Sequence, residues 1–321
     1  MNRFWTNVRI APLMGLPGIR LSGSTVKQNL ENAEAQCNSL RALYNLFRPD
    51  VLFTMMDLSV EAEACGVELN KPENRSFSVK QHPVGNASDL AGLRIPDPGA
   101  DGRMPVVLHV VEQLSRDLDC LTAAYISGPF TLASLLAGAG KALRGVIRDP
   151  QFIRELLEYS TEVIVRYALA LQENGADCVC ILEPTAGVLS PDQFEVNSAA
   201  YLKRIIASLE VPVILHICGD TSVLLPKMVE TGCSALSLDS QVDLARVLEE
   251  TEQQIQIIGN IDPVSIVAYG SRQDIEQALL EAVALAKAHP NLTISTGCDL
   301  PLDTNMDNLE TFFVQSRAGF A

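Results

Sequence analysis

A histidine and two cysteines stand where three side chains could share one metal ion. His216 and Cys218 lie two residues apart at the end of the apolar run VPVILHIC, and Cys298 follows the run LTISTG. Alternate side chains of a strand point to one face, so His216 and Cys218 can face the same point. One imidazole and two thiolates form a soft, tetrahedral ligand set that suits zinc and leaves a fourth position open. We therefore predict a zinc site at His216, Cys218 and Cys298.

The alternative for these three residues is packing, because buried histidines and small apolar cysteines are common in protein cores. The strongly apolar run before His216, Gly219 after Cys218 and Gly297 before Cys298 favour the metal site.

Four further polar residues directly follow apolar runs, namely Asp57, Glu183, Asp239 and Asn260. If those runs are parallel strands, their carboxyl ends meet at the edge where such proteins keep their chemistry. We therefore expect these four residues to line the same pocket. For Glu183 and Asp239 the competing interpretation is a helix cap or a backbone anchor.

The remaining cysteines and histidines are expected to be structural. Cys178 and Cys180 form a Cys-x-Cys pair, but they fall in the middle of an apolar run and should point into a packed layer. The others have no second ligand nearby and are assigned to packing, to the surface or to helices: Cys37, Cys65, Cys120, Cys233, His82, His109 and His289.

The elements that must position these residues follow from the hydrophobic pattern. Eight apolar, β-branched runs predict buried parallel strands at 8–13, 51–56, 121–127, 177–182, 211–217, 235–238, 255–259 and 292–296. Stretches of helical period lie between them and include 27–47, 150–173, 193–209, 240–252 and 272–288. This alternation predicts an α/β fold, a (β/α)8 TIM barrel formed by one domain over residues 1–321.

A doubly wound open sheet is the alternative fold. It is disfavoured because MGLPGIRLSG (14–23) lacks the glycine spacing of a nucleotide-binding turn and does not lead directly into a helix. The region 68–103 is rich in Pro, Gly, Asn and Asp without periodicity, and we expect a long loop over the barrel mouth there.

The net charge and the cysteine content restrict the kinds of partner that the protein can bind and the cellular compartment in which we expect it. The formal net charge of −15 argues against nucleic acid or an anionic membrane surface as the main partner. No run approaches the length of a membrane helix, and the N-terminus does not resemble a signal peptide. Eight scattered cysteines do not form a secreted disulfide framework. We expect a cytoplasmic protein.

Six segments of the chain, taken in order, resemble the uroporphyrinogen decarboxylase superfamily and within it the branch of corrinoid-dependent methyltransferases. They are PDVLFTMMDLSVEAEACGVEL, ISGPFTLASLL, ILEPTAGVLSPDQFEVNSAAYLKRI, VPVILHICGDTSVLLPKMVETGCSALSLD, IIGNIDPVSIVAYGS and ISTGCDLPLDTNMDNLETF. His216, Cys218 and Cys298 match the zinc-binding pattern of the methyltransferase branch. Asp57 matches the essential aspartate of the decarboxylases, but the arginine-rich N-terminal signature of those enzymes is reduced here to Arg20.

The resemblance implies an enzyme that moves a methyl group between a methylcobalamin-type corrinoid and a small acceptor, most readily a thiol such as coenzyme M, activated as a thiolate by zinc. Glu183 would be a displaceable fourth ligand or would orient His216. The chain has no Asp-x-His-x-x-Gly motif, so we expect the corrinoid on a partner protein that docks at the barrel mouth. The alternatives are a uroporphyrinogen decarboxylase, demethylation of a methylated substrate, a folate acceptor, or binding without catalysis.

Overall fold

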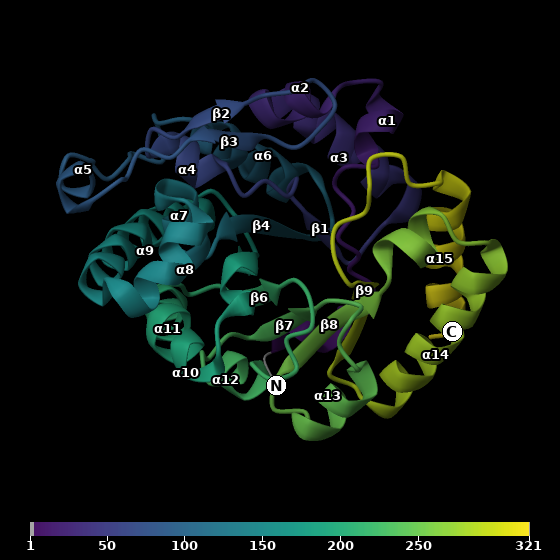
Figure 1. Ribbon diagram of the computed structural model, residues 1–321. Coiled ribbons are helices and arrows are strands. Elements are labelled where there is room, and N and C mark those ends of the chain that lie inside the picture. Colours follow the sequence, from purple (N-terminus) through teal and green to yellow (C-terminus); the bar gives the residue numbers. More distant parts are fainter. Residues whose placement is uncertain (1–2, 321) are drawn as a thin grey trace.

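Seven parallel strands form one curled sheet at the centre of the molecule (Figure 1). This computed structural model describes residues 3–320, so Met1, Asn2 and Ala321 of the predicted domain lie outside it. The order in the sheet is β1-β4-β5-β6-β7-β8-β9. The strands are β1 Val51–Phe53, β4 Leu121–Ser127, β5 Cys178–Leu182, β6 Val213–Ile217, β7 Ala235–Leu238, β8 Gln256–Ile261 and β9 Leu292–Thr296.

Each of these seven strands coincides with or lies close to a predicted run, whereas the predicted strand 8–13 is wrong as a strand. Ile10 makes one isolated parallel bridge to Ile294 of β9, and its carbonyl accepts a hydrogen bond of 3.1 Å from the backbone N–H of Asp50. Pro12 has no N–H to extend the ladder. The segment therefore joins β9 to the start of β1 through separate hydrogen bonds.

The sheet is buried on both faces, as continuous apolar strands require. One set of alternate residues, including Phe53, Tyr125 and Cys180, packs inside the curl of the sheet. The other set, including Val179 and Leu215, packs outward in the larger core beneath the helices. The same alternation turns the side chain of His216 to the inside, above that inner cluster.

Helices cover the outside of the sheet, with α9 and α11 on one flank and α14 and α15 on the other (Figure 1). The α-helices and the shorter 3-10 and π segments (η) are η1 Arg3–Asn7, α1 Gly18–Ser22, α2 Val26–Glu31, α3 Ala33–Phe47, α4 Val60–Ala64, α5 Ala87–Ala91, α6 Met104–Asp117, α7 Pro129–Ala137, α8 Ala139–Arg148, α9 Pro150–Glu173, η2 Pro184–Val188, α10 Pro191–Phe194, η3 Glu195–Ala199, α11 Ala200–Ala207, α12 Leu225–Val229, α13 Leu244–Glu250, η4 Pro263–Ala268, α14 Arg272–Ala288 and α15 Met306–Ala318.

Helix capping explains why some predicted helices are confirmed and others are interrupted. The predictions 150–173 and 272–288 are confirmed as α9 and α14. The prediction 27–47 is two helices, because Asn32 adopts an extended conformation and its side chain caps α3 by accepting from the Ala35 N–H.

Two other predicted helices also differ from the observed helices in their boundaries. The prediction 193–209 divides into α10, the π-helical stretch η3 and α11. The prediction 240–252 shortens to α13, whose N-cap is Asp243.

The region 68–103 is not a bare loop. It contains an antiparallel hairpin of β2 Glu68–Asn70 and β3 Ser78–Gln81, followed by α5. Phe77, in the turn of the hairpin, packs with Met55, Leu30 and Leu302. Because Met55 and Leu302 follow β1 and β9, the hairpin lies at the end of the sheet where the strands finish, which is where the loop was expected.

No single helix within residues 3–320 is long and apolar enough to span a membrane. Helices α7 and α8 reach that length only together, with a bend of 107° between them.

Candidate metal centre

Three predicted ligands meet at one point at the carboxyl ends of β6 and β9. The ligand atoms of His216, Cys218 and Cys298 all lie within 4.8 Å of one another. The distance from His216 Nε2 to Cys218 Sγ is 3.2 Å, and the two sulfurs are 3.7 Å apart. His216 is fully buried, whereas both cysteines are partly exposed, so the group can be reached from the side of the sulfurs.

The spacing of these atoms can be compared with a tetrahedral zinc site. Bonds of about 2.3 Å to sulfur and about 2.0 Å to nitrogen place two sulfurs about 3.8 Å apart, and a nitrogen and a sulfur about 3.5 Å apart. The observed distances are 3.7 Å and 3.2 Å. Both the donor types and their separation therefore fit zinc, with one coordination position left for another group.

The orientation of His216 is set by the neighbouring strand. Its Nδ1 lies 3.2 Å from the Ser237 carbonyl oxygen and 3.1 Å from Ser237 Oγ. A carbonyl can only accept, which favours a proton on Nδ1 and leaves the Nε2 lone pair facing Cys218. Ser237 thus holds the imidazole in the tautomer that a metal ligand needs. The sequence analysis missed Ser237, and its position opposite His216 in the β6–β7 register is a signal only once the strands are paired.

The two thiols share a hydrogen bond that separates their acidities. The bond lowers the pKa of Cys218 and raises the pKa of Cys298 to about 12. Cys218 is therefore the first of the pair to become a thiolate. Metal binding requires both thiols to lose their protons.

The turn after Cys218 is held by Asp239 and Asn260. Gly219 has a φ of +87°, a conformation that favours glycine, and its N–H donates to Asp239 Oδ2 over 2.9 Å. Asn260 Nδ2 donates to the carbonyl oxygens of Asp239 and Val242 at 2.9 and 2.8 Å. The structure thus brings Asp239 and Asn260 to the metal centre as supports of its loops.

Cys298 reaches the centre through a close approach of two loops. A Cβ on Gly297 would lie 2.4 Å from the Ser240 backbone nitrogen, so a larger residue does not fit. The Gly297 N–H donates to the Ile261 carbonyl over 2.8 Å. Gly297 therefore lets the β9 loop lie against the β7 loop, which brings Cys298 beside Cys218.

Glu183 is buried next to the centre, but its carboxylate faces α7. Oε1 accepts from the Phe130 N–H at 2.9 Å and from Ser198 Oγ at 2.8 Å, and Oε2 accepts from the Thr131 N–H at 2.8 Å. The expected contact with the His216 ring is replaced by that of Ser237. Both carboxylate oxygens satisfy donors at the start of α7, which matches the competing interpretation of Glu183 as a helix anchor.

Asp57 lies in a buried ion-pair network with Arg103. Asp57 Oδ2 accepts from Arg103 Nη1, and Oδ1 accepts from the N–H and hydroxyl of Ser59 at 2.8 and 2.6 Å. Arg103 also pairs with Glu63 and lies over the Phe77 ring, 4.7 Å from its centre. The sequence analysis missed Arg103, because it stands in an irregular stretch without any motif.

The other cysteines and histidines occupy the positions that the sequence indicated. Cys178 and Cys180 lie fully buried inside the sheet, where burial raises the pKa of both thiols. Within residues 3–320, the triad is the one group of three or more potential metal ligands. His82 is exposed, His109 lies on α6 and His289 is the C-cap of α14.

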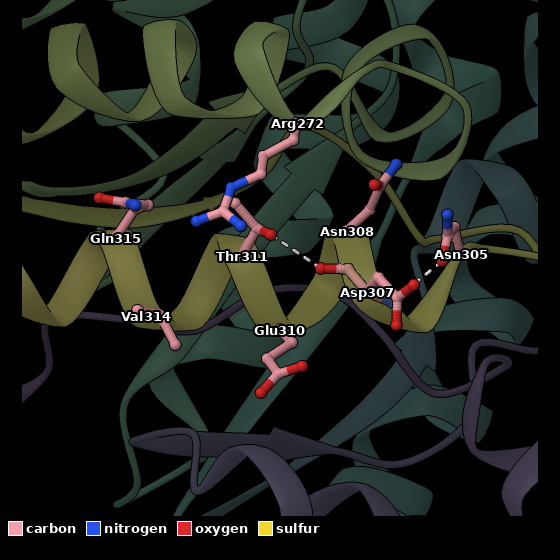
Figure 2. A pocket seen from close by; sticks show the side chains of 8 residues that line it. All are labelled: Arg272, Asn305, Asp307, Asn308, Glu310, Thr311, Val314 and Gln315. Carbon is pink, nitrogen blue, oxygen red and sulfur yellow. Dashed lines mark hydrogen bonds between the residues drawn. The ribbon is translucent and has the colours of Figure 1, made fainter.

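Two open depressions of the surface lie away from the triad. One, of about 650 Å³, runs along α15 (Figure 2) and is lined by Arg272, Asn305, Asp307, Asn308, Glu310, Thr311, Val314 and Gln315. Several of its polar groups already have partners: Thr311 Oγ1 donates to the Asp307 carbonyl over 2.8 Å, and Asn308 Nδ2 donates to the Gly270 carbonyl over 2.9 Å. A second, of about 540 Å³, lies where β1 and β4 begin, opposite the strand ends that carry the ligands. Neither includes a triad residue.

Comparison with known proteins identifies the family. The family model described as uroporphyrinogen decarboxylase (URO-D) matches residues 16–318. The chain belongs to the uroporphyrinogen decarboxylase family.

Relatives described with two different activities match this chain. A protein described as methylcobamide:CoM methyltransferase MtbA, from Methanosarcina acetivorans, is 26% identical over 96% of this chain and 94% of its own length. A uroporphyrinogen decarboxylase from Prochlorococcus marinus is 26% identical over 91% of this chain and 85% of its own. The solved structure of a methyltransferase from Methanosarcina mazei matches with a TM-score of 0.91, at 23% identity, over 99% of this chain and 97% of that one. That likeness shows a shared fold.

A buried carboxylate in this family member makes stability depend on pH. Glu61 is 1% exposed and accepts from the Ser127 N–H at 2.6 Å and from Ser127 Oγ at 3.1 Å. Burial raises its pKa from the ordinary 4.5 to about 7. The folded state therefore holds this proton more tightly than the unfolded chain, so the stability present below pH 4.5 declines as the pH rises to about 7.

We expect Glu61→Gln to be more stable than the parent at pH 8, by up to roughly 3 kcal/mol, because glutamine cannot ionise and its Oε1 can accept from Ser127. At pH 4.5 the two should be nearly equal. Urea unfolding at both pH values measures this, with the exposed Glu310→Gln as the matched control. A difference that is the same at both pH values contradicts it.

Proposed function

We propose that this protein is a zinc-dependent methyltransferase that moves a methyl group between a corrinoid carried by a partner protein and a small acceptor, a thiol. The observation that carries the proposal is the convergence of His216 Nε2, Cys218 Sγ and Cys298 Sγ within 4.8 Å at the end of the sheet. The relatives described as methylcobamide:CoM methyltransferases, which align over nearly the whole chain, support the same chemistry.

His216, Cys218 and Cys298 would hold the zinc. A zinc ion held there would lower the pKa of a thiol acceptor and so supply it as a thiolate at neutral pH. Ser237 keeps Nε2 of His216 unprotonated, while Asp239 holds the turn after Cys218 and is itself held by Asn260. Because Cys218 and Cys298 are partly exposed residues, a large methyl donor could approach the acceptor from outside without entering the sheet.

The fold gives this site a rigid support. We propose that segment 9–13 completes the seven-stranded sheet as a closed eight-membered barrel, because its backbone bonds to β9 on one side and to Asp50, before β1, on the other. A closed barrel holds the ends of β6 and β9 at a constant separation. In the same frame Glu183 positions α7, and Asp57 neutralises Arg103.

The competing decarboxylase function requires Asp57 to act on a polycarboxylate substrate. In this chain both oxygens of Asp57 are committed to Arg103 and Ser59, and the side chain is 6% exposed. A polyanionic substrate also needs several guanidinium partners, and Arg103 is already paired with two carboxylates. These contacts favour the methyltransferase.

We expect no measurable conversion of uroporphyrinogen to coproporphyrinogen by the purified protein. The reason is that the carboxylate matching the essential aspartate is bound to Arg103. The assay follows porphyrin products after oxidation, with an authentic decarboxylase as the positive control. Turnover at ordinary enzyme concentration would overturn the assignment to the methyltransferase branch.

The direct test of the proposed function combines two measurements on one preparation. Metal analysis should find about one zinc per chain. The same protein should then demethylate methylcobalamin in the presence of a panel of thiols, slowly because the free corrinoid lacks its carrier protein. A protein that contains zinc but transfers no methyl group to any thiol contradicts the proposal.

A further inference from the structure

Cys218 and Cys298 are two cysteines whose sulfur atoms are in contact. The sulfurs lie 3.7 Å apart, and no other pair of cysteines among residues 3–320 is joined by such a contact. Both residues are partly exposed. The cysteines that a solute cannot reach are Cys37, Cys65, Cys178, Cys180 and Cys233, which are buried. Cys120 is partly exposed but has no sulfur beside it. A small oxidant can therefore reach this pair, and each sulfur has its partner next to it.

The separation of the two sulfurs is short enough for a disulfide after a small movement. A disulfide places its sulfurs about 2.05 Å apart, so the pair must close by roughly 1.6 Å from the observed 3.7 Å. A change of one side chain between staggered rotamers moves its sulfur further than this. By contrast, Cys178 and Cys180 are two residues apart along β5, where parallel side chains keep the β-carbons well beyond the about 4 Å that a disulfide requires.

The two loops that carry the pair differ in the space around them. Gly219, after Cys218, has a φ of +87°, and a Cβ built on it would meet no atom within 4 Å. Gly297, before Cys298, is packed so closely that a Cβ would lie 2.4 Å from the Ser240 backbone nitrogen. The loop of Cys298 is therefore fixed, whereas the turn after Cys218 has open space beside it and can supply the movement.

We propose that Cys218 and Cys298 form a reversible disulfide by exchange with a small-molecule disulfide, and that this cross-link and a bound zinc ion exclude each other. One cysteine attacks the small disulfide, which forms a mixed disulfide and releases one small thiol. The other cysteine attacks the sulfur of the first and releases the second small thiol. The two protein thiols lose two electrons, and their two protons leave on the two small thiols, so the exchange is balanced.

The cross-link removes two of the three ligands at once. A metal ligand must be a thiolate, and a sulfur in a disulfide carries no such charge. His216 then remains alone, and one imidazole does not retain zinc. This inference rests on the proposed function, because it assigns a redox control to the same zinc centre. A thiol acceptor is the reduced form of such a small disulfide, so the ratio of the two sets the fraction of the protein that can hold zinc.

The test uses the purified full-length protein, first reduced and loaded with zinc, and oxidised glutathione as the oxidant. Bound zinc should fall from about one ion per chain to below roughly 0.1. Alkylation of the remaining thiols, followed by peptide mapping without reduction, should recover the peptides of Cys218 and Cys298 joined to each other. Reduction with tris(2-carboxyethyl)phosphine should separate these peptides, and added zinc should again bind at about one ion per chain.

The matched control is Cys120→Ala, which removes the other partly exposed thiol. It should give the same cross-link and the same loss of zinc as the parent. In Cys218→Ala, Cys298 has no partner within reach, so it should end as a mixed disulfide with glutathione and form no cross-link. Because the peptide map of the parent identifies the cross-link directly, the result does not depend on the folding of a variant.

Contrary results distinguish this inference from the proposed function. Free Cys218 and Cys298 after oxidation, or a cross-link from either to another cysteine, overturn the inference and leave the methyltransferase intact. A cross-linked protein that retains its zinc has the same meaning. A reduced protein that binds no zinc overturns the proposed function and this inference together, even if the disulfide forms.

Discussion

Zinc should be lost from the double variant Cys218→Ala, Cys298→Ala, falling from about one ion per chain to below roughly 0.1, because one imidazole cannot retain the metal alone. The two sulfurs stand 3.7 Å apart and both lie beside His216 Nε2, so each substitution removes a ligand from the same ion. Methyl transfer should disappear with the metal. Inductively coupled plasma spectrometry on dialysed protein measures the zinc, and methylcobalamin demethylation measures the activity.

The control for this experiment is another cysteine of similar exposure. Cys120 is also partly exposed but lies before β4, near where the strands begin. Cys120→Ala should keep its zinc and its activity. Stoichiometric zinc in the double variant would refute the site, and loss of zinc from Cys120→Ala would show that the metal is elsewhere.

His216→Ala should stay folded while methyl transfer falls by about two orders of magnitude or more, the scale typical of removing one preorganised group from an active site. The side chain is fully buried, and its hydrogen-bond partners are Ser237 at Nδ1 and Cys218 at Nε2. Losing a buried polar ring costs about 2 kcal/mol, which lowers the melting temperature of a chain of this size by only a few degrees. The large inner and outer cores remain intact.

Differential scanning calorimetry and transfer assays with the corrinoid partner distinguish the two effects. His216→Gln is the matched variant, because glutamine keeps most of the volume and can still donate to the Ser237 carbonyl. It should melt closer to the parent but remain as inactive as His216→Ala. If His216→Ala unfolds at room temperature, the imidazole is structural; if it folds with full activity, the zinc mechanism is wrong.

Local sequence features were enough to place the seven strands of the sheet and to select three candidate metal ligands. Parallel strands buried on both faces must be continuous apolar runs, and polar residues at their ends are then conspicuous. For this reason His216, Cys218 and Cys298 could be selected from the sequence and lie together in the structure. The caps of α9 and α14 are also local, formed by Asp149 and Ser271 with the turns that follow them.

Contacts between distant segments could not be predicted in this way. The segment 8–13 is not a strand because Ile10 makes only an isolated bridge to Ile294 and Pro12 cannot extend it. The hairpin β2–β3 is held against the strand ends by Phe77. Glu183 was expected to serve the metal, yet the start of α7 offers it two backbone N–H groups. A carboxylate binds whichever donors the fold brings nearest, and its own sequence neighbours do not reveal them.

The sequence by itself therefore determined the α/β class, the positions of the seven strands of the sheet and the choice of His216, Cys218 and Cys298 as candidate ligands, because these depend on residue type and on spacing within one element. The tertiary structure alone decided the partners of each polar group. Ser237 orients His216, Arg103 neutralises Asp57, and Gly297 admits the loop that carries Cys298. Hydrogen bonds and ion pairs act over about 3 Å in space, irrespective of separation along the chain, and 80 residues separate Cys218 from Cys298.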